Sequence, residues 1–169
     1  SGRPDGAADR LLMMADKNPN RRGLEAIAKG LGLSLEPFSK LSAAVDAGEV
    51  KALYAIGAEV PEEGFAEKAA RLELFVVQAS NEGALTAHAH VLLPASTHLE
   101  DEGTFTQADG ITQRFRRAYP PRQDSQPHWK RAVELAKELG GTLGWGSSRE
   151  VFRTVAPSVP ELATFEWDK

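Results

Sequence analysis

Three histidines close together are the first residues in this sequence that could do chemistry. His88 and His90 are two positions apart, so on a strand they would share a face, and His98 follows. Imidazole nitrogens are common metal ligands, but such sites need further ligands at set spacings. No carboxylate stands at a ligand spacing here, and the chain has no cysteine. We therefore expect no metal site, and we expect these histidines to be unrelated surface or strand-end residues.

The glycine-rich segment 140–146 is a second candidate. A loop that binds phosphate follows a strand and opens a helix, so that its backbone N–H groups point at the anion. This segment instead follows a strongly helical pattern, which indicates a helix C-cap and a connector. The sequence contains neither a dinucleotide-binding fingerprint nor a Walker-type loop.

A cluster of arginines lies close to the acidic stretch 100–102. Its members are Arg114, Arg116, Arg117 and Arg122. The whole chain is acidic, with 20 Lys and Arg against 24 Asp and Glu and a net charge of −4. Nucleic-acid binding needs a surplus of cations along the phosphate backbone. We therefore expect the arginines to pair with acidic neighbours or to contact a protein partner, and we expect no nucleic-acid partner.

The elements that position these residues alternate between short apolar runs and helical patterns. The runs at 50–56, 72–78 and 90–93 predict strands, and the segments 61–71 and 81–87 between them predict helices. Strands that are apolar almost throughout and alternate with helices indicate a parallel sheet covered on both faces. The predicted fold class is α/β: an open, doubly wound, Rossmann-like three-layer sheet with a small hairpin or irregular insertion and C-terminal helices.

Other elements flank this unit. Further helices are predicted at 22–31, 38–47, 126–139 and 148–155, a small hairpin at 104–106 and 111–115, and a strand or helical turn at 10–15. The patterns also predict where three helices start. Pro61 lies in the first turn of the helix at 61–71, Ser80 or Asn81 caps the helix at 81–87, and Ser125 caps the helix at 126–139. Trp129 is the largest side chain on its helix's apolar stripe, so we expect it to anchor that helix to the sheet.

Three loops follow the predicted strands, at 57–59, 78–82 and 94–96. Open α/β sheets bind ligands at the carboxyl ends of their strands, so these loops are the candidate binding edge. Every α/β domain has such loops, and no Ser/His/Asp arrangement is identifiable from spacing. The residues alone therefore predict no catalytic centre.

Length and composition limit the class of protein. The chain has 169 residues, which predicts a single α/β domain over residues 1–169. No apolar run approaches the roughly 18 residues of a membrane helix, and the start shows no signal peptide. Ser1-Gly2 is the kind of dipeptide that tag removal leaves, so we expect an excised piece of a larger subunit.

The most distinctive motif lies between residues 74 and 113. It contains Val-Val-Gln at 76–78, Leu-Leu-Pro-Ala at 92–95, and a glutamate, Glu100, shortly before Gly-Thr-Phe at 103–105. This pattern resembles the molybdopterin oxidoreductase family, and with weaker matches it extends over about residues 18–139. The resemblance implies the third, α/β domain of such proteins. Within the family it is similar to the C-terminal region of the large iron–sulfur subunit of bacterial NADH–quinone oxidoreductase (complex I).

Departures from the family pattern fall in the loops at the sheet edge. Where members that carry the cofactor show Gly-x-Asn-Pro, this sequence has Gly57 and then Glu59, and a carboxylate would repel a pyrophosphate. The family's Asn after Thr-Phe-Thr is Gln107 here. The resemblance thus favours a domain with no cofactor, metal or catalytic residue of its own. In the alternative, the residues nearest a pterin are Gly57, Glu59, Gln78 and Gln107.

These observations leave three functions open. The favoured interpretation is a structural and interaction domain of the large complex I subunit, inactive alone, in a parent that carries iron–sulfur clusters. The alternative is a molybdopterin-binding domain of a formate dehydrogenase-like or nitrate reductase-like enzyme. The third is an unrelated small-molecule-binding α/β module. In the favoured interpretation the partners are preceding domains of the parent and other subunits of a membrane-associated complex. The domain would then lie on the cytoplasmic face of the membrane without insertion.

Overall fold

The chain separates into two compact units in a computed structural model, which describes residues 6–7, 15–16 and 18–168. The sheet unit consists of residues 36–101 and 117–141. The hairpin unit consists of residues 1–35, 102–116 and 142–169. The prediction for residues 10–15 falls almost entirely outside the described residues, and a single domain over the whole chain stays a prediction.

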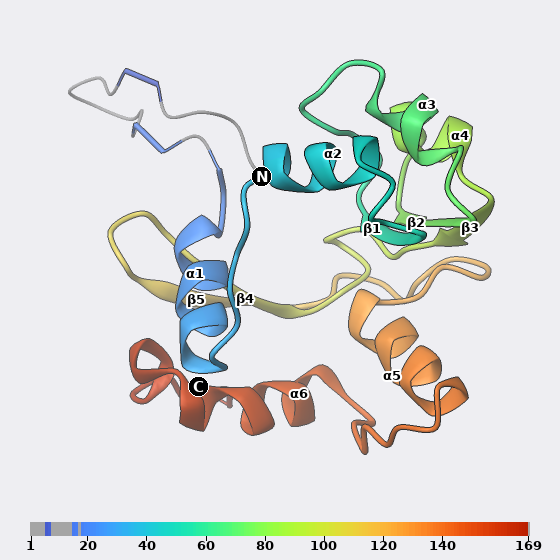
Figure 1. The fold of residues 1–169 in the computed structure, drawn as a ribbon. Helices are drawn as coiled ribbons and strands as arrows, with labels where there is room; N and C mark the ends of the chain where they lie inside the picture. Colours follow the sequence, from blue (N-terminus) through green and yellow to red (C-terminus); the bar gives the residue numbers. More distant parts are fainter. Residues whose placement is uncertain (1–5, 8–14, 17, 169) are drawn as a thin grey trace. The chain divides into compact units, whose positions relative to one another are not determined.

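The sheet unit is built on three parallel strands. They are β1 (Ala52–Ile56), β2 (Leu74–Ala79) and β3 (Val91–Pro94), and they pair in the order β1-β2-β3 (Figure 1). Near-continuous apolar runs form them, as expected for a parallel sheet. The α/β class, with a parallel sheet, an antiparallel hairpin and C-terminal helices, is confirmed.

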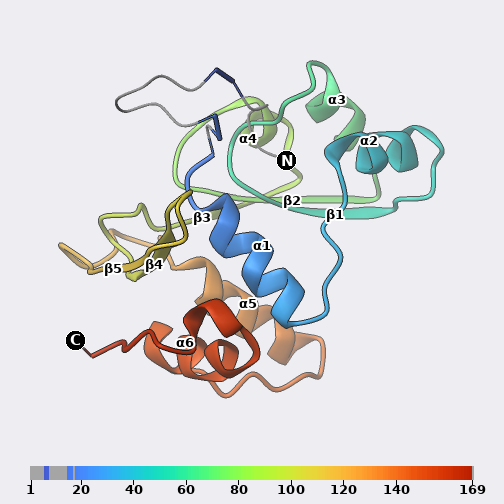
Figure 2. The same cartoon turned by 90° about the vertical axis from the view of Figure 1, so that its left-hand side faces the viewer.

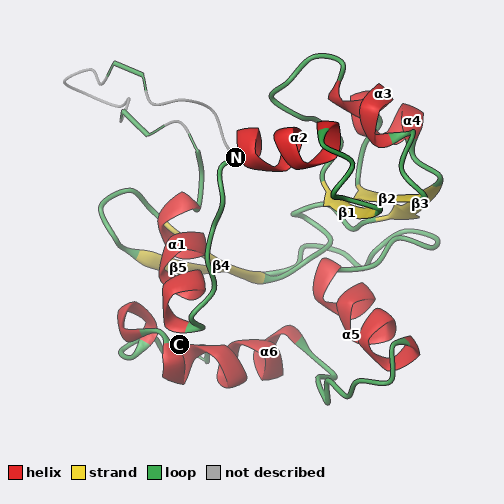
Figure 3. Ribbon diagram, in the orientation of Figure 1, coloured by secondary structure: helices red, strands yellow, loops and turns green. Residues whose placement is uncertain are grey.

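Three helices pack on one face of this sheet, as Figures 1 and 3 show. They are α2 (Phe38–Asp46), α3 (Phe65–Ala69) and α4 (Ala84–His88). Consecutive strands joined by right-handed crossovers place α3 and α4 on the same side. Phe75 and Val77 of β2 are fully buried beneath them, and Phe65 of α3 packs edge-on against Phe38 of α2 with ring centroids 4.7 Å apart.

Two of the predicted helices are shorter than expected. The prediction of a helix over 61–71 was wrong for its first turn, because Gly64 takes a left-handed φ of 78° and α3 begins after it. The prediction of Ser80 or Asn81 as the next cap was also wrong. Gly83 precedes α4, and its N–H donates to Thr86 Oγ1 over 2.9 Å.

Helix α5 (His128–Glu138) lies on the other side of the sheet from α3 and α4 in both views (Figures 1 and 2). Ser125 does not cap it, because the Ser125 hydroxyl donates to Arg122 O instead, and Pro127 precedes the helix. No residue of α5 is buried, and Trp129 is half-buried. Trp129 is therefore less buried than predicted, and its role as the anchor of α5 stays a prediction. Two residues of the predicted stripe, Ala132 and Leu139, are exposed.

The hairpin unit joins helix α1 (Arg21–Gly30) to an antiparallel pair, β4 (Gly103–Thr106) and β5 (Thr112–Phe115). The Thr106 N–H donates to Asn20 Oδ1 over 2.9 Å and holds β4 at the start of α1. The rest is C-terminal: α6 (Ser148–Val155), with Ser147 as its N-cap, and two short 3-10 helices, η1 (Ala156–Ser158) and η2 (Pro160–Leu162). The predicted hairpin and the helix at 148–155 are confirmed.

Glycines end three of the helices in the same way. Gly32, Gly48 and Gly140 follow α1, α2 and α5 with positive φ angles of 67°, 73° and 80°. Each donates its N–H to the carbonyl three residues earlier, and the next residue bonds five residues back. This paired pattern satisfies the last free carbonyls of a helix. The segment 140–146 therefore begins as a C-cap, as predicted.

Candidate functional site

The carboxyl edge of the parallel sheet brings together three of the four predicted site residues. Gly57 follows β1 with φ 109°, and its N–H donates to Gln78 O over 2.9 Å. The next turn packs on α4, because the Leu85 N–H donates to Ala58 O over 2.9 Å. A Cβ on Gly83 would lie 2.3 Å from Glu59 Oε1, so the Glu59 carboxylate lies directly over this glycine.

Gln78 is the polar residue of this edge whose hydrogen bonding is incomplete. Its exposed fraction is 1%, and its Oε1 accepts the Tyr54 hydroxyl over 2.8 Å. Its Nε2 is buried and has no partner among the described residues. A buried donor without a partner is costly, so this N–H group is placed to serve an acceptor that the described residues do not provide.

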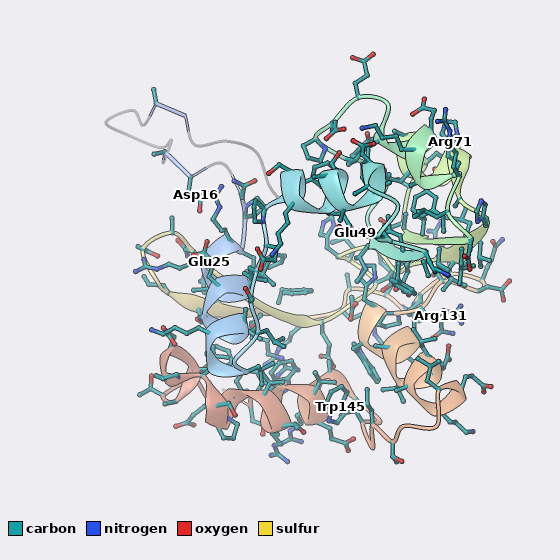
Figure 4. All side chains as sticks on the ribbon, in the orientation of Figure 1. Asp16, Glu25, Glu49, Arg71, Arg131 and Trp145 are labelled. Atoms are coloured by element: carbon teal, nitrogen blue, oxygen red, sulfur yellow. The ribbon has the colours of Figure 1, made fainter. Side chains whose placement is uncertain are left out.

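Tyr54 and Arg131 shape the charge around Gln78. Burial raises the pKa of the Tyr54 hydroxyl, and the nearby Arg131 guanidinium works in the opposite direction. Arg131 projects from the first turns of α5, the end of that helix nearer the sheet (Figure 4). Tyr54 therefore stays neutral and remains a hydrogen-bond donor to Gln78 at ordinary pH.

The loop after β3 is held by a buried carboxylate. One oxygen of Glu100 accepts the Thr97 N–H over 2.9 Å and the Thr97 hydroxyl over 3.1 Å, and the other accepts the Arg122 N–H over 3.2 Å. Glu100 is 5% exposed. The pKa of Glu100 is lowered, mainly by the hydrogen bond from the Thr97 amide. The Thr97 hydroxyl and then the Arg122 amide lower it further, whereas burial acts in the opposite direction.

The fourth predicted residue, Gln107, belongs to the hairpin unit. Its N–H donates to Ile111 O over 2.9 Å, and its side-chain Nε2 donates to Gln113 Oε1 over 2.7 Å. These contacts give Gln107 a local role in the turn between β4 and β5. Its participation in a ligand site stays a prediction.

The histidines hold separate positions. His88 ends α4, with Nε2 3.7 Å from a Glu67 oxygen. His90 precedes β3, where Nδ1 accepts the Phe75 N–H over 3.0 Å and Nε2 lies 2.9 Å from Ala70 O. Because an amide can only donate and a carbonyl only accept, His90 is the neutral tautomer with its proton on Nε2. Among the described residues no cluster of three or more His, Asp or Glu could hold a metal ion.

Sequence reasoning assigned no function to His128. The residue opens α5 and is half-buried, and its Nδ1 has no partner among the described residues. Burial lowers the pKa of His128, while the Asp101 carboxylate acts in the opposite direction. No pattern described in the sequence singled His128 out.

One member of the arginine cluster, Arg114, pairs with an acidic neighbour, as predicted for the cluster. Arg114 NH2 lies 3.0 Å from Glu102 Oε2, and Arg114 NH1 donates to Trp167 O over 2.7 Å. The same guanidinium stacks over the Trp167 ring, 4.5 Å from its centroid. Arg114 thus ties β5 to the C-terminal segment of the hairpin unit.

Comparison with known proteins identifies the family to which the chain belongs. Residues 13–138 match the sequence profile of the molybdopterin oxidoreductase family, which is most of the chain. The chain belongs to this family.

Three relatives make the comparison more specific. The chain is 37% identical over 125 residues to the alpha subunit of an NADPH-Fe(3+) oxidoreductase from Geobacter sulfurreducens. It is 28% identical over 130 residues to a candidate formate dehydrogenase of Bacillus subtilis, and 30% identical over 172 aligned positions to one of Staphylococcus aureus. These matches cover 71%, 74% and 92% of this chain.

The matched parts are small pieces of the relatives, covering 15%, 13% and 18% of their lengths. The family assignment made from the sequence is confirmed. The finer likeness to the large complex I subunit is corrected, because the relatives found are formate dehydrogenases and an NADPH-Fe(3+) oxidoreductase. Within the described part of the chain, no helix has the length and apolar character needed to cross a membrane.

Proposed function

We propose that this chain is one part of the molybdopterin-binding portion of a formate dehydrogenase-like oxidoreductase. The main support for this proposal is the similarity to candidate formate dehydrogenases, which extends over up to 92% of the chain. These relatives are compared within the molybdopterin oxidoreductase family, to which the chain belongs. In this proposal the longer polypeptide oxidises formate to carbon dioxide and passes the electrons to an acceptor. When bound, the cofactor supplies the redox centre for that step.

The residues at the sheet edge fit such a group in part. Gln78 Nε2 is a buried donor without a described partner, and it would donate to a carbonyl or phosphate oxygen of the cofactor. Gly57 leaves the backbone bare at the end of β1, because nothing lies within 4 Å of its Cβ position. The Glu59 carboxylate lies over Gly83 and would repel an anion there. The phosphates of the cofactor would therefore lie away from Glu59.

One unit with one sheet edge does not enclose a ligand of this size, since such ligands are largely buried in pre-formed clefts. The proposal therefore places the rest of the cleft in other parts of the polypeptide. The isolated 169-residue chain is expected to retain neither pterin nor metal, and to have no redox activity.

The test uses the whole natural gene product. Formate-dependent reduction of an artificial dye is measured, together with the pterin released after denaturation and oxidation. The Gln78→Glu variant replaces the open donor by an acceptor at constant shape, and we expect it to lose most of its pterin. Tyr54→Phe removes the hydroxyl but keeps the Gln78 donor, so it is the matched control and should retain pterin.

If pterin-loaded protein shows no formate-dependent dye reduction, formate is rejected as the substrate. Absence of both pterin and dye reduction, with NADH-dependent quinone reduction instead, would restore the structural role in a complex I-like enzyme. The membrane-associated partner subunits and the cytoplasmic location belong to that second interpretation.

A further inference from the structure

The hairpin unit contains a cavity of about 560 Å³ between the end of β5 and the segment that follows η2. Small-molecule sites typically have volumes of about 300–1,000 Å³. The residues that line the cavity all belong to this one compact unit. They are Gln113, Arg114, Arg116, Thr164, Phe165 and Glu166.

Arg114 forms a fixed part of this lining. One of its terminal nitrogens lies 3.0 Å from Glu102 Oε2, and the other donates to Trp167 O over 2.7 Å. Its guanidinium also stacks over the Trp167 ring. These contacts hold Arg114 in place and offset its charge, so another residue must supply the cation for an anionic ligand.

Arg116 is that cation, because it is exposed and forms no hydrogen bond or ion pair with the residues that the structure describes. A guanidinium group binds phosphate or carboxylate oxygens through two parallel N–H groups. The Thr164 hydroxyl also has no partner in the described part of the chain. Gln113 accepts Gln107 Nε2 through its Oε1, which leaves its own N–H groups available. The cavity thus offers one cation and two neutral donors to an oxyanion.

Phe165 and Glu166 restrict what such an oxyanion can be attached to. The half-buried Phe165 ring packs edge-on against Phe152, with centroids 5.3 Å apart, and also lines the cavity. An aromatic ring held in this way is a surface on which a flat ring of a ligand stacks. The Glu166 carboxylate disfavours a second anionic group. The lining therefore suits a ligand with one anionic group joined to a flat, uncharged ring.

We propose that this cavity binds a nucleoside monophosphate, with the phosphate at Arg116 and the base on the Phe165 ring. A nucleoside monophosphate combines a single phosphate group with a flat, uncharged base, which are the two features that the lining selects. The inference does not rest on the proposed function, because neither the sheet edge nor a pterin takes part in it.

The test is isothermal titration calorimetry of the whole natural gene product with AMP as the probe. Adenosine, which lacks the phosphate, and inorganic phosphate, which lacks the ring, are titrated separately. Arg116→Gln removes the cation at an exposed position. The matched control is Arg117→Gln, the same change at the next residue, which is also exposed but does not line the cavity. Thr164→Val, at another exposed position, keeps the test available if Arg116→Gln does not fold.

We expect AMP to bind the wild type and Arg117→Gln equally, with a Kd below about 1 mM. Loss of the charge-assisted hydrogen bonds in Arg116→Gln should weaken AMP binding at least about tenfold, and loss of one neutral donor in Thr164→Val about fivefold. Adenosine and inorganic phosphate should each bind at least about tenfold more weakly than AMP. Absence of AMP binding, or equal affinities in the cavity variants and Arg117→Gln, would overturn the proposal. Phosphate that binds as tightly as AMP would indicate an adventitious ion only, and would overturn it as well.

Discussion

At the scale of single residues, Glu100 explains why the family motif places a glutamate shortly before Gly-Thr-Phe. Its two oxygens receive hydrogen bonds from Thr97 and Arg122, and so join the loop after β3 to the chain that leads to α5. The motif could be recognised in the sequence, but this role could not, because Arg122 lies 22 positions away.

The lowered pKa of Glu100 predicts a change of stability with pH. A carboxyl group with a lower pKa in the folded state stabilises the fold at pH above its unfolded value, and this contribution is lost as the pH falls through the folded value. We expect Glu100→Gln to lower the free energy of unfolding at pH 7. The difference from the wild type should shrink toward acidic pH, in urea titrations from pH 7 to pH 3.

Because Asp16 and Glu62 also have lowered pKa values, the difference between the two proteins is the quantity to follow. Glu63→Gln is the control, because it makes the same change from carboxylate to amide at an exposed position. A constant difference between Glu100→Gln and the wild type over the whole range would contradict this role.

Gly83 gives a second prediction at this scale. Its φ of −177° is accessible to any residue, but an added Cβ would lie 2.7 Å from Ala58 O and 2.3 Å from Glu59 Oε1. Overpacking of this kind costs about 1–3 kcal/mol, so Gly83→Ala should lower the free energy of unfolding by that amount. Gly144→Ala, where nothing lies within 4 Å, should change it by much less. Equal effects at both positions would show that Gly83 is not closely packed against Ala58 and Glu59.

At the scale of elements, the three strands could be predicted because each is a nearly continuous apolar run. The short helices were less predictable, since one glycine decides where α3 begins and Gly83 rather than a polar cap precedes α4. The apolar stripe of α5 was visible in the sequence. Its exposure was not, because a stripe shows which side of a helix is apolar and not whether anything covers it.

Comparison of Phe75 with Trp129 tests this difference between the core and α5. Phe75 is fully buried, so Phe75→Ala should lower the free energy of unfolding by about 3–5 kcal/mol. Trp129 is half-buried, so Trp129→Ala should cost less than half as much. Urea midpoints followed by circular dichroism measure both. Equal losses would mean that Trp129 belongs to the core after all.

At the scale of the molecule, the sequence pointed to a candidate binding edge through a general property of parallel sheets. Gly57, Glu59 and Gln78 follow or end neighbouring strands, so they meet at one edge. Gln107 could not be placed in this way, because it belongs to a hairpin in the other unit. The family was identified from the motif alone, but the motif did not select a reaction within the family.

In our proposal, this chain helps to hold a molybdopterin group within a longer enzyme. The most direct measurement is the pterin and molybdenum content of the whole natural gene product, purified without air and compared with the isolated 169-residue chain. We expect stoichiometric pterin and metal in the whole protein and neither in the isolated chain. A folded whole protein that contains neither would contradict the account.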